Sequence, residues 1–168
     1  MIIKDFNDFD TNELYAIFRH IYITSPFMSD NFDRKFNSII DFRNYYHQIL
    51  RQNGSFVMVT LVDKRPAGFL VLASNPAEKL NHTAWLNMGI LESFRRKGIG
   101  VQLVESAIER ARKENLIEII YLMVRADHTG AVQLYRKTGF EVIARLEKDT
   151  KIGNDYYDGL LMRKFVQI

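Results

Sequence analysis

The sequence contains no cysteine, which excludes disulfide bonds, thiolate metal sites and a catalytic thiol. It also lacks an apolar run near the roughly 18 residues of a membrane-spanning helix, and its first residues show no basic segment before a long apolar stretch. The four histidines, at positions 20, 47, 82 and 128, show no metal-ligand spacing. We therefore expect a cytoplasmic protein that binds neither a metal nor a membrane.

The sequence also lacks a large excess of either charge, because 23 basic side chains nearly balance 20 acidic ones and leave a formal net charge of +3. That excess is too small to indicate a nucleic-acid partner. The 168 residues, 47% of them hydrophobic, suit one globular domain with its own core. No internal repeat, low-complexity tract or flexible linker divides them, so we expect a single domain over residues 1–168.

The first half of the sequence predicts two helices and four strands. Asp10 is the expected N-cap for a helix over Thr11–Thr24, which ends before Pro26. A second helix is expected over Asp33–Gln52, with these side chains facing inward: Phe36, Ile39, Ile40, Tyr46 and Leu50. The expected strands are 1–4, 56–62, 67–73 and 83–91, and a turn at 63–66 joins the middle two.

The second half alternates strands and helices. After the apolar run Trp85–Leu91, a helical stripe appears at Leu103, Val104, Ala107, Ile108 and Ala111. Ile117–Val124 is nearly all apolar, which suits a strand buried on both faces. A further helix is expected over Thr129–Thr138, with Gly139 as its cap, before an extended segment begins at Phe140. Two strands joined by such a helix pair in parallel, because the helix carries the chain back.

The junction Arg95-Arg96-Lys97-Gly98-Ile99-Gly100 is the most informative stretch, because it puts glycines and positive charge where a strand turns into a helix. The first amides of a helix have no partner inside it, and the helix dipole adds about half a positive charge there. A pyrophosphate would suit such a place. The pattern is neither a Walker A loop nor a dinucleotide fingerprint, whose third glycine would fall on Leu103. A plain basic turn before a helix is the alternative interpretation.

Short motifs follow one another along this half: Met88-Gly89-Ile90, Arg95-x-x-Gly98-x-Gly100, Val124, Ala131, Leu134-Tyr135, Gly139-Phe140 and the closing segment Asn154–Met162. In order and spacing they resemble the GNAT superfamily of acyl-CoA-dependent N-acetyltransferases, in particular its small bacterial members. The resemblance implies an α/β fold. In this mixed (α+β) fold the central sheet is mostly antiparallel. The sheet would be splayed between the fourth and fifth strands, with helices on both faces.

The resemblance also implies transfer of an acetyl group from acetyl-CoA to a primary amine of a small molecule or peptide, by direct attack in a ternary complex. The implied catalytic residues are Met88, whose N–H polarises the thioester oxygen, and Tyr135, the acid beside the leaving sulfur. Relatives carry a bulge at the position of Met88–Ile90, which would free that N–H. The implied acetyl-CoA-binding residues are Met88, Gly89, Ile90, Arg95, Arg96, Lys97, Gly98, Ile99, Gly100, His128, Ala131 and Tyr135.

His128 departs from the family pattern, because relatives usually carry asparagine there and an imidazole replaces only part of an amide's hydrogen bonding. The general base stays open between His82, Glu92 and a chain of waters, since Ala84 stands where several relatives carry glutamate. These departures favour the alternative function, a non-catalytic acyl-CoA-binding sensor or partner module. Family members are often homodimers, but nothing in the sequence specifies an interface.

The acceptor pocket is expected between the first two helices, the final hairpin and the splayed strands. That neighbourhood is rich in aromatic and flexible apolar side chains: Tyr22, Phe27, Met28, Phe32, Tyr45, Tyr46, Tyr156 and Tyr157. They form either a pocket wall or ordinary core. Asp155 or Asp158 is an alternative candidate, as a residue that anchors the substrate.

Overall fold

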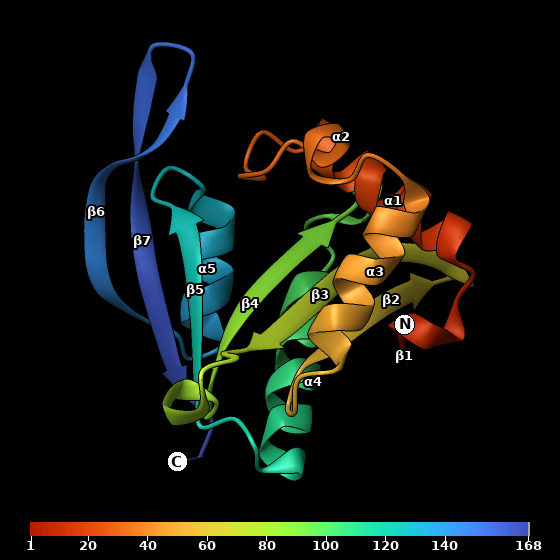
Figure 1. Ribbon diagram of the computed structural model, residues 1–168. Helices are drawn as coiled ribbons and strands as arrows, with labels where there is room; N and C mark the ends of the chain where they lie inside the picture. Colours follow the sequence, from red (N-terminus) through yellow and green to blue (C-terminus); the bar gives the residue numbers. More distant parts are fainter. Residues whose placement is uncertain (168) are drawn as a thin grey trace.

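A seven-stranded sheet forms the centre of the protein (Figure 1). The computed structural model describes residues 1–167. The strands are β1 Ile2–Asp5, β2 Phe56–Val62, β3 Arg65–Ser74, β4 Thr83–Ile90, β5 Ile119–Arg125, β6 Glu141–Ile152 and β7 Asp155–Phe165. They lie in the order β1-β2-β3-β4-β5-β7-β6, and β4–β5 is the one parallel pair within residues 1–167. The mixed, mostly antiparallel sheet expected from the sequence is confirmed.

Helices cover both faces of this sheet (Figure 1). On one face lie α1 (Thr11–Thr24), α2 (Phe32–Lys35) and α3 (Ile39–Leu50), and on the other lie α4 (Ile99–Glu114) and α5 (Thr129–Lys137). Successive strand residues point to opposite faces. In β3, accordingly, Leu70 belongs to the core under α4 and α5, whereas Phe69 belongs to the core under α1–α3. Short 3-10 segments complete the chain: η1 Phe6–Asp8, η2 Glu78–Leu80 and η3 Glu92–Phe94.

Aromatic rings fill the core between the sheet, α1 and α3. Phe18 of α1 stacks on Phe69 of β3 with ring centroids 3.9 Å apart, and Phe42 of α3 meets Phe18 edge-on at 5.3 Å. All three rings are 0% exposed, and full burial of such a side chain contributes about 2–3 kcal/mol. This packing fixes the end of α1 and therefore the start of the loop at residues 25–31, which borders the site described below.

The helix expected over Asp33–Gln52 is wrong, because the chain forms two helices there. The backbone of Phe36 and of Ser38 is extended, which separates α2 from α3. Ser38 caps α3, since its Oγ accepts a hydrogen bond from the N–H of Asp41 at 3.1 Å. Of the side chains expected to face inward, Ile40 is 56% exposed. The other helices and strands whose two ends were expected lie within two residues of those positions.

The sheet opens between β4 and β5, as the resemblance implied. Parallel pairing between these strands is restricted to Thr83↔Ile119 and the two pairs that follow, the last of which is Trp85↔Tyr121. The pairing of β4 with β3 continues without a register shift to the end of β4. The bulge implied at Met88–Ile90 is therefore absent on the β3 side, and the opening arises because β5 leaves β4.

The last two strands form a long hairpin that extends beyond the rest of the sheet (Figure 1). β6 is its outer strand and an edge of the sheet, and most of its side chains are exposed. The β6–β7 pairing shifts register twice, at 142/144 and at 146/150. Irregularities of this kind bend a hairpin. Residues 149–152 of β6 border the opening between β4 and β5.

Candidate functional site

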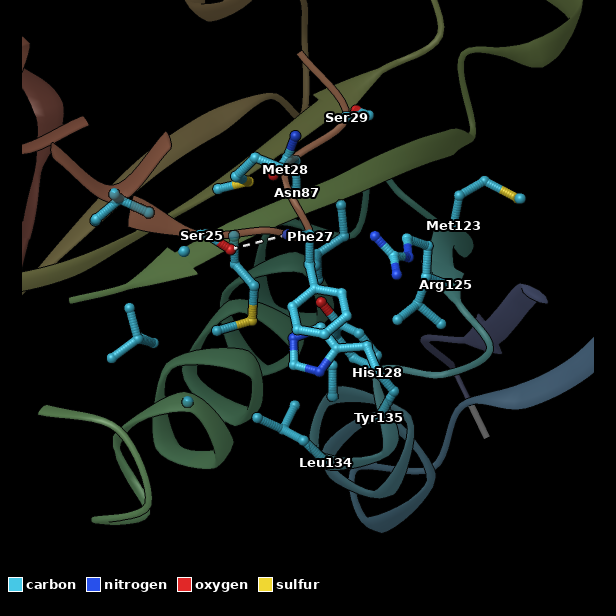
Figure 2. Close-up of a pocket in the computed structure, with 18 of the residues that line it drawn as sticks. Ser25, Phe27, Met28, Ser29, Asn87, Met123, Arg125, His128, Leu134 and Tyr135 are labelled. Carbon is cyan, nitrogen blue, oxygen red and sulfur yellow. Dashed lines mark hydrogen bonds between the residues drawn. The ribbon is translucent and has the colours of Figure 1, made fainter. Parts of the chain in front are cut away.

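The opening between β4 and β5 is a cleft of about 850 Å³, within the range of small-molecule sites. The end of β4, the loop at 95–98 and the first turn of α4 line it on one side, and α5 with the end of β5 lines it on the other. Residues of the 25–31 loop, of α3 and of the β6 hairpin close the remaining sides. Figure 2 shows side chains of α5, β5 and the 25–31 loop converging there.

The backbone of β4 presents unpaired amides to this cleft. The N–H of Leu91 donates to the carbonyl of Ala67 at 2.8 Å, so by antiparallel alternation the odd-numbered residues of β4 bond to β3. The even-numbered residues, Leu86, Met88 and Ile90, direct their N–H groups toward β5. The last bond of the β4–β5 ladder uses the N–H of Leu86. Met88 therefore carries the first β4 amide that faces the opening instead of a strand.

α4 begins with open amides at the cleft. Its N-cap is Gly98, with a left-handed φ of +77°, and no side chain within residues 1–167 caps it. Because the N–H of Gln102 is the first to bond back, to the carbonyl of Gly98 at 3.2 Å, the amides of residues 99–101 have no helical partner. A Cβ built on Gly98 would meet no heavy atom within 4 Å. A ligand therefore has room to approach the backbone closely.

The three basic side chains before α4 point to different places. Arg95 lines the cleft and is fixed there, because its Nε donates to the carbonyl of Ile90 at 3.0 Å. Arg96 also lines the cleft and has a positive φ of 58°, an uncommon conformation for a residue with a side chain. Lys97 does not line it, because its Nζ donates to the carbonyl of Ser93 at 2.9 Å.

α5 presents a second open helix start to the same cleft. His128 is its N-cap, but its imidazole makes no capping hydrogen bond, and the first turn contains no acidic residue. His128, Ala131 and Tyr135 all line the cleft, as residues at helical spacings of three and seven share one face. Tyr135 is buried, and that burial raises the pKa of its phenol well above the usual value of 10.0. The phenol therefore stays protonated and can donate a hydrogen bond.

The 25–31 loop contacts the start of α5 across the cleft. The ring of Phe27 stacks on the imidazole of His128, with centroids 3.8 Å apart and planes 19° from parallel (Figure 2). Arg125 adds a second link, because its guanidinium donates to the carbonyl of Pro26 at 3.1 Å. The same guanidinium lies 3.8 Å from the ring centroid of Tyr157 on β7. The loop is thus linked directly to β5 and to the start of α5, and through Arg125 to β7.

The structure brings most of the expected site residues together. The ones that line the cleft are Met88, Gly89, Ile90, Arg95, Arg96, Gly98, Ile99, Gly100, His128, Ala131 and Tyr135. Of the expected acceptor-side residues, Tyr22, Phe27, Met28, Tyr45 and Tyr46 line it, whereas Phe32, Tyr156 and Tyr157 do not.

Neither candidate general base is brought into the cleft. His82 immediately precedes β4, at the end of the strand opposite Met88, and its carbonyl accepts a hydrogen bond from the N–H of Glu118 at 2.7 Å. Glu92 lies in η3 and does not line the cleft. Asp158 is also occupied elsewhere, because its carboxylate accepts hydrogen bonds from Arg145 and from the N–H of Lys148.

Sequence reasoning missed several polar residues of the cleft. Arg125, Lys35 and Asn87 line it, but none belongs to a motif. Arg125 follows an apolar strand, and that position was the one available signal. Within residues 1–167, no group of three or more His, Cys, Asp or Glu side chains is arranged to hold a metal ion. No helix in that part of the chain is both long and apolar enough to cross a membrane.

Comparison with known proteins identifies the family. The profile described as "Acetyltransferase (GNAT) family" matches residues 12–140. The chain belongs to the GNAT family. An N-alpha-acetyltransferase of Sulfurisphaera tokodaii is 32% identical to this GNAT chain over 72 residues, which are 43% of each protein. The match therefore spans less than half of that relative's length.

Solved GNAT structures share the whole fold. The GNAT-family acetyltransferase of Streptococcus pneumoniae has a TM-score of 0.89 at 22% identity, and the match covers 98% of both chains. The yncA protein of Salmonella typhimurium, solved with its cofactor acetyl-CoA, has a TM-score of 0.85 at 14% identity. That match covers 100% of this chain and 95% of yncA. The GNAT fold expected from the sequence motifs is thus confirmed.

Proposed function

We propose that this GNAT protein transfers an acetyl group from acetyl-CoA to a primary amine, by direct attack while both substrates are bound. One observation carries the proposal. The first unpaired amide of β4 and the open N-termini of α4 and α5 all face a single cleft. A helix start and an unpaired strand amide both favour an oxygen that bears negative charge. Family membership gives the acyl donor.

The site fits acetyl-CoA at the start of α4. The open amides of residues 99–101, the clear space beside Gly98 and the side chains of Arg95 and Arg96 suit a pyrophosphate. Ile90, Ala131 and His128, which line the opening between β4 and α5, are the proposed neighbours of the pantetheine arm. When bound, acetyl-CoA supplies an acetyl group activated as a thioester.

Two groups of the protein would assist the reaction. The N–H of Met88 donates to the carbonyl oxygen as negative charge develops on it, and such a fixed donor contributes about 3 kcal/mol in other enzymes. The hydroxyl of Tyr135 donates to the sulfur that leaves. A phenol has a pKa near 10 and a thiol near 8.5, so the phenol is protonated when the thiolate forms and can stabilise it.

The acceptor would enter from the side of the 25–31 loop and α3. Tyr22, Tyr45 and Tyr46 make this wall aromatic, and the charge of Lys35 there is paired with the carboxylate of Asp30. A primary amine on a small molecule or on a peptide suits it. The relative from Sulfurisphaera tokodaii is called an N-alpha-acetyltransferase, which favours an α-amino group as the first acceptor to test.

A non-catalytic acyl-CoA-binding module is the second candidate function. It is favoured by Ala84, which is buried in the core under α4 and supplies no carboxylate to the cleft. The two functions differ in turnover, because a binding module would take up acetyl-CoA without releasing thiol in the presence of any amine.

Release of free thiol from acetyl-CoA, measured against a panel of α-amines, ε-amines and small amines, tests the proposal. Tyr135→Phe should lower kcat by about 10²-fold, because the acid is lost, while calorimetry should give an unchanged Kd for acetyl-CoA. Tyr121→Phe is the matched control, since Tyr121 lies on β5 outside the cleft. Tight acetyl-CoA binding without thiol release for any amine would favour the binding module. Equal kcat in Tyr135→Phe and wild type would rule out the acid role.

A further inference from the structure

The proposed transfer needs a group that takes a proton from the acceptor amine, and the cleft offers few. His82 and Glu92 do not line it. Among residues 1–167, His128 is the one imidazole and Asp149 the one carboxylate that do. Asp149 lies on the β6 hairpin, whereas His128 begins the helix that carries Tyr135. His128 is therefore the titratable side chain to consider near the reaction.

His128 and Tyr135 share the face of α5 that lines the cleft, one heptad apart, with Ala131 between them. Helical side chains lean toward the N-terminus of their helix, so the phenol of Tyr135 extends in the direction of His128. The small Ala131 leaves the space between them open. An acid for the departing sulfur and a proton acceptor for the incoming nitrogen would thus border the same space from one rigid element (Figure 2).

The imidazole is held in place but chemically free. Its plane is fixed by the stack on Phe27 at 3.8 Å. Neither ring nitrogen forms a hydrogen bond with any group in residues 1–167. Because Phe27 belongs to the loop on the acceptor side, the imidazole lies at the border between acceptor and acetyl-CoA. A neutral imidazole has one nitrogen lone pair available to accept a proton.

Burial, together with the charges around it, keeps His128 neutral. Arg95 faces it from the loop before α4, and Arg125 and Asp127 face it from the end of β5 and the following loop. Tyr135 faces it from α5, and the 25–31 loop contributes the uncharged ring of Phe27. Burial, followed by Arg95, lowers the pKa of His128 from its ordinary value of 6.5; Asp127 opposes this shift, and Arg125 adds the smallest lowering effect. The group is thus in its basic form at neutral pH.

We propose that His128 is the general base, which accepts a proton from the ammonium form of the acceptor. This inference rests on the proposed function. The N–H bond of the ammonium breaks and its proton moves to an imidazole nitrogen, so the amine regains its lone pair. That lone pair forms the new N–C bond, the C–S bond breaks, and the sulfur takes the proton of Tyr135. The new amide nitrogen returns a proton to Tyr135, and the imidazolium loses its proton to water.

The first test compares pH profiles of wild type and His128→Gln with an α-amine acceptor, whose pKa of about 7.7–8.0 lies near that of imidazole. We expect kcat of the variant to fall by about 10²-fold. The decline of wild-type kcat below the ordinary histidine pKa of 6.5 should be missing in the variant. His20→Gln is the control, because His20 is exposed on α1 outside the cleft, and its profile should match wild type.

Two further readouts separate proton transfer from a mere acetyl-CoA contact. Calorimetry without acceptor should show that His128→Gln raises the Kd for acetyl-CoA by much less than the loss of about 10²-fold in kcat, because His128 is one of several neighbours of the pantetheine arm. Added imidazole should restore part of the activity of His128→Ala. A Kd that rises in proportion to the loss of activity, with an unchanged pH profile, would overturn the base role and leave acetyl transfer standing. Absence of thiol release by wild type with every amine would overturn both.

Discussion

The α-helices in residues 1–167 begin in two different ways. α1, α2 and α3 are capped by their own side chains, from Asp10, Asn31 and Ser38, and each has an acidic residue in its first turn. α4 and α5 have neither a side-chain cap nor an acid there. The first three helices thus satisfy their own amides and offset their own dipoles. α4 and α5 leave their first amides uncapped and their dipoles without a nearby acid, and both helices start at the cleft.

The difference indicates which helix starts stabilise the fold and which bind a ligand. A cap such as Asp10, whose Oδ1 accepts from the N–H of Asn12 at 2.8 Å, stabilises a helix but occupies the place where an anion would bind. A glycine start keeps that place empty. We therefore expect substitutions at the open start of α4 to act mainly on acetyl-CoA binding, and substitutions at the capped start of α1 to act mainly on stability.

The largest effect is expected from a methyl group added at the start of α4. Gly98→Ala should raise the Kd for acetyl-CoA by about 10- to 100-fold, or roughly 1.4–2.7 kcal/mol, because the Cβ would occupy the clear space beside the amides. Gly153→Ala is the matched control. Gly153 also has a positive φ, +60° against +77° for Gly98, and open space around its Cβ, but it lies in the β6–β7 turn.

Both alanines carry a similar backbone penalty of about 1–2 kcal/mol, so calorimetry isolates the effect on binding from the effect on folding. Equal Kd values in the two variants would contradict the assignment of the pyrophosphate to α4.

An acidic residue introduced into the first turn of α4 should have a smaller effect, and it should raise stability while weakening acetyl-CoA binding. Val101→Glu places a carboxylate in the first turn, where it should increase the free energy of unfolding by about 0.5 kcal/mol through the helix dipole. The same charge should repel a pyrophosphate by about 1 kcal/mol, which is about fivefold in Kd. Val101→Gln is the isosteric neutral control. Denaturant unfolding and calorimetry would measure the two effects. A Val101→Glu variant that was more stable and also bound acetyl-CoA more tightly would contradict the assignment of the open amides of α4 to the ligand.

The backbone part of this molecule could be predicted from the sequence better than the side-chain part. The crossover from β4 through α4 to β5 was predictable because apolar strands, an amphipathic stripe and glycines at a turn are local requirements. The break between α2 and α3 was not, because helical spacing of apolar residues continues through it while Ser38 competes for the backbone.

The candidate site divides in the same way. The open amides of α4 leave a signature in Gly98, whereas the acceptor wall uses side chains that also belong to the core, such as Tyr46, which is 2% exposed and still lines the cleft. His82 lies six residues before Met88, and a strand rises about 3.3 Å per residue, so roughly 20 Å separates them. The contact of His128 with Phe27 joins distant parts of the chain and has no local signature.

The smallest effect is expected from substitutions at the start of α1, which should change the stability of the fold without changing acetyl-CoA binding. Hydrogen bonds from the side chain and backbone of Asn12 lower the pKa of Asp10 from 3.8. Because the unfolded state then binds the proton more readily, the cap contributes fully above 3.8, and its contribution is lost as the pH falls through the lowered value.

Asp10→Ala should therefore unfold at a slightly lower temperature than wild type near pH 7, and the difference should vanish in acid. Asp10→Asn, a good cap that does not titrate, should keep its advantage over alanine at every pH. The Kd for acetyl-CoA should be unchanged in both variants, because the start of α1 does not line the cleft. A Kd for acetyl-CoA that changed on substitution of Asp10, or a lower unfolding temperature of Asp10→Ala that persisted in acid, would contradict the proposal that capped helix starts stabilise the fold and open ones bind the ligand.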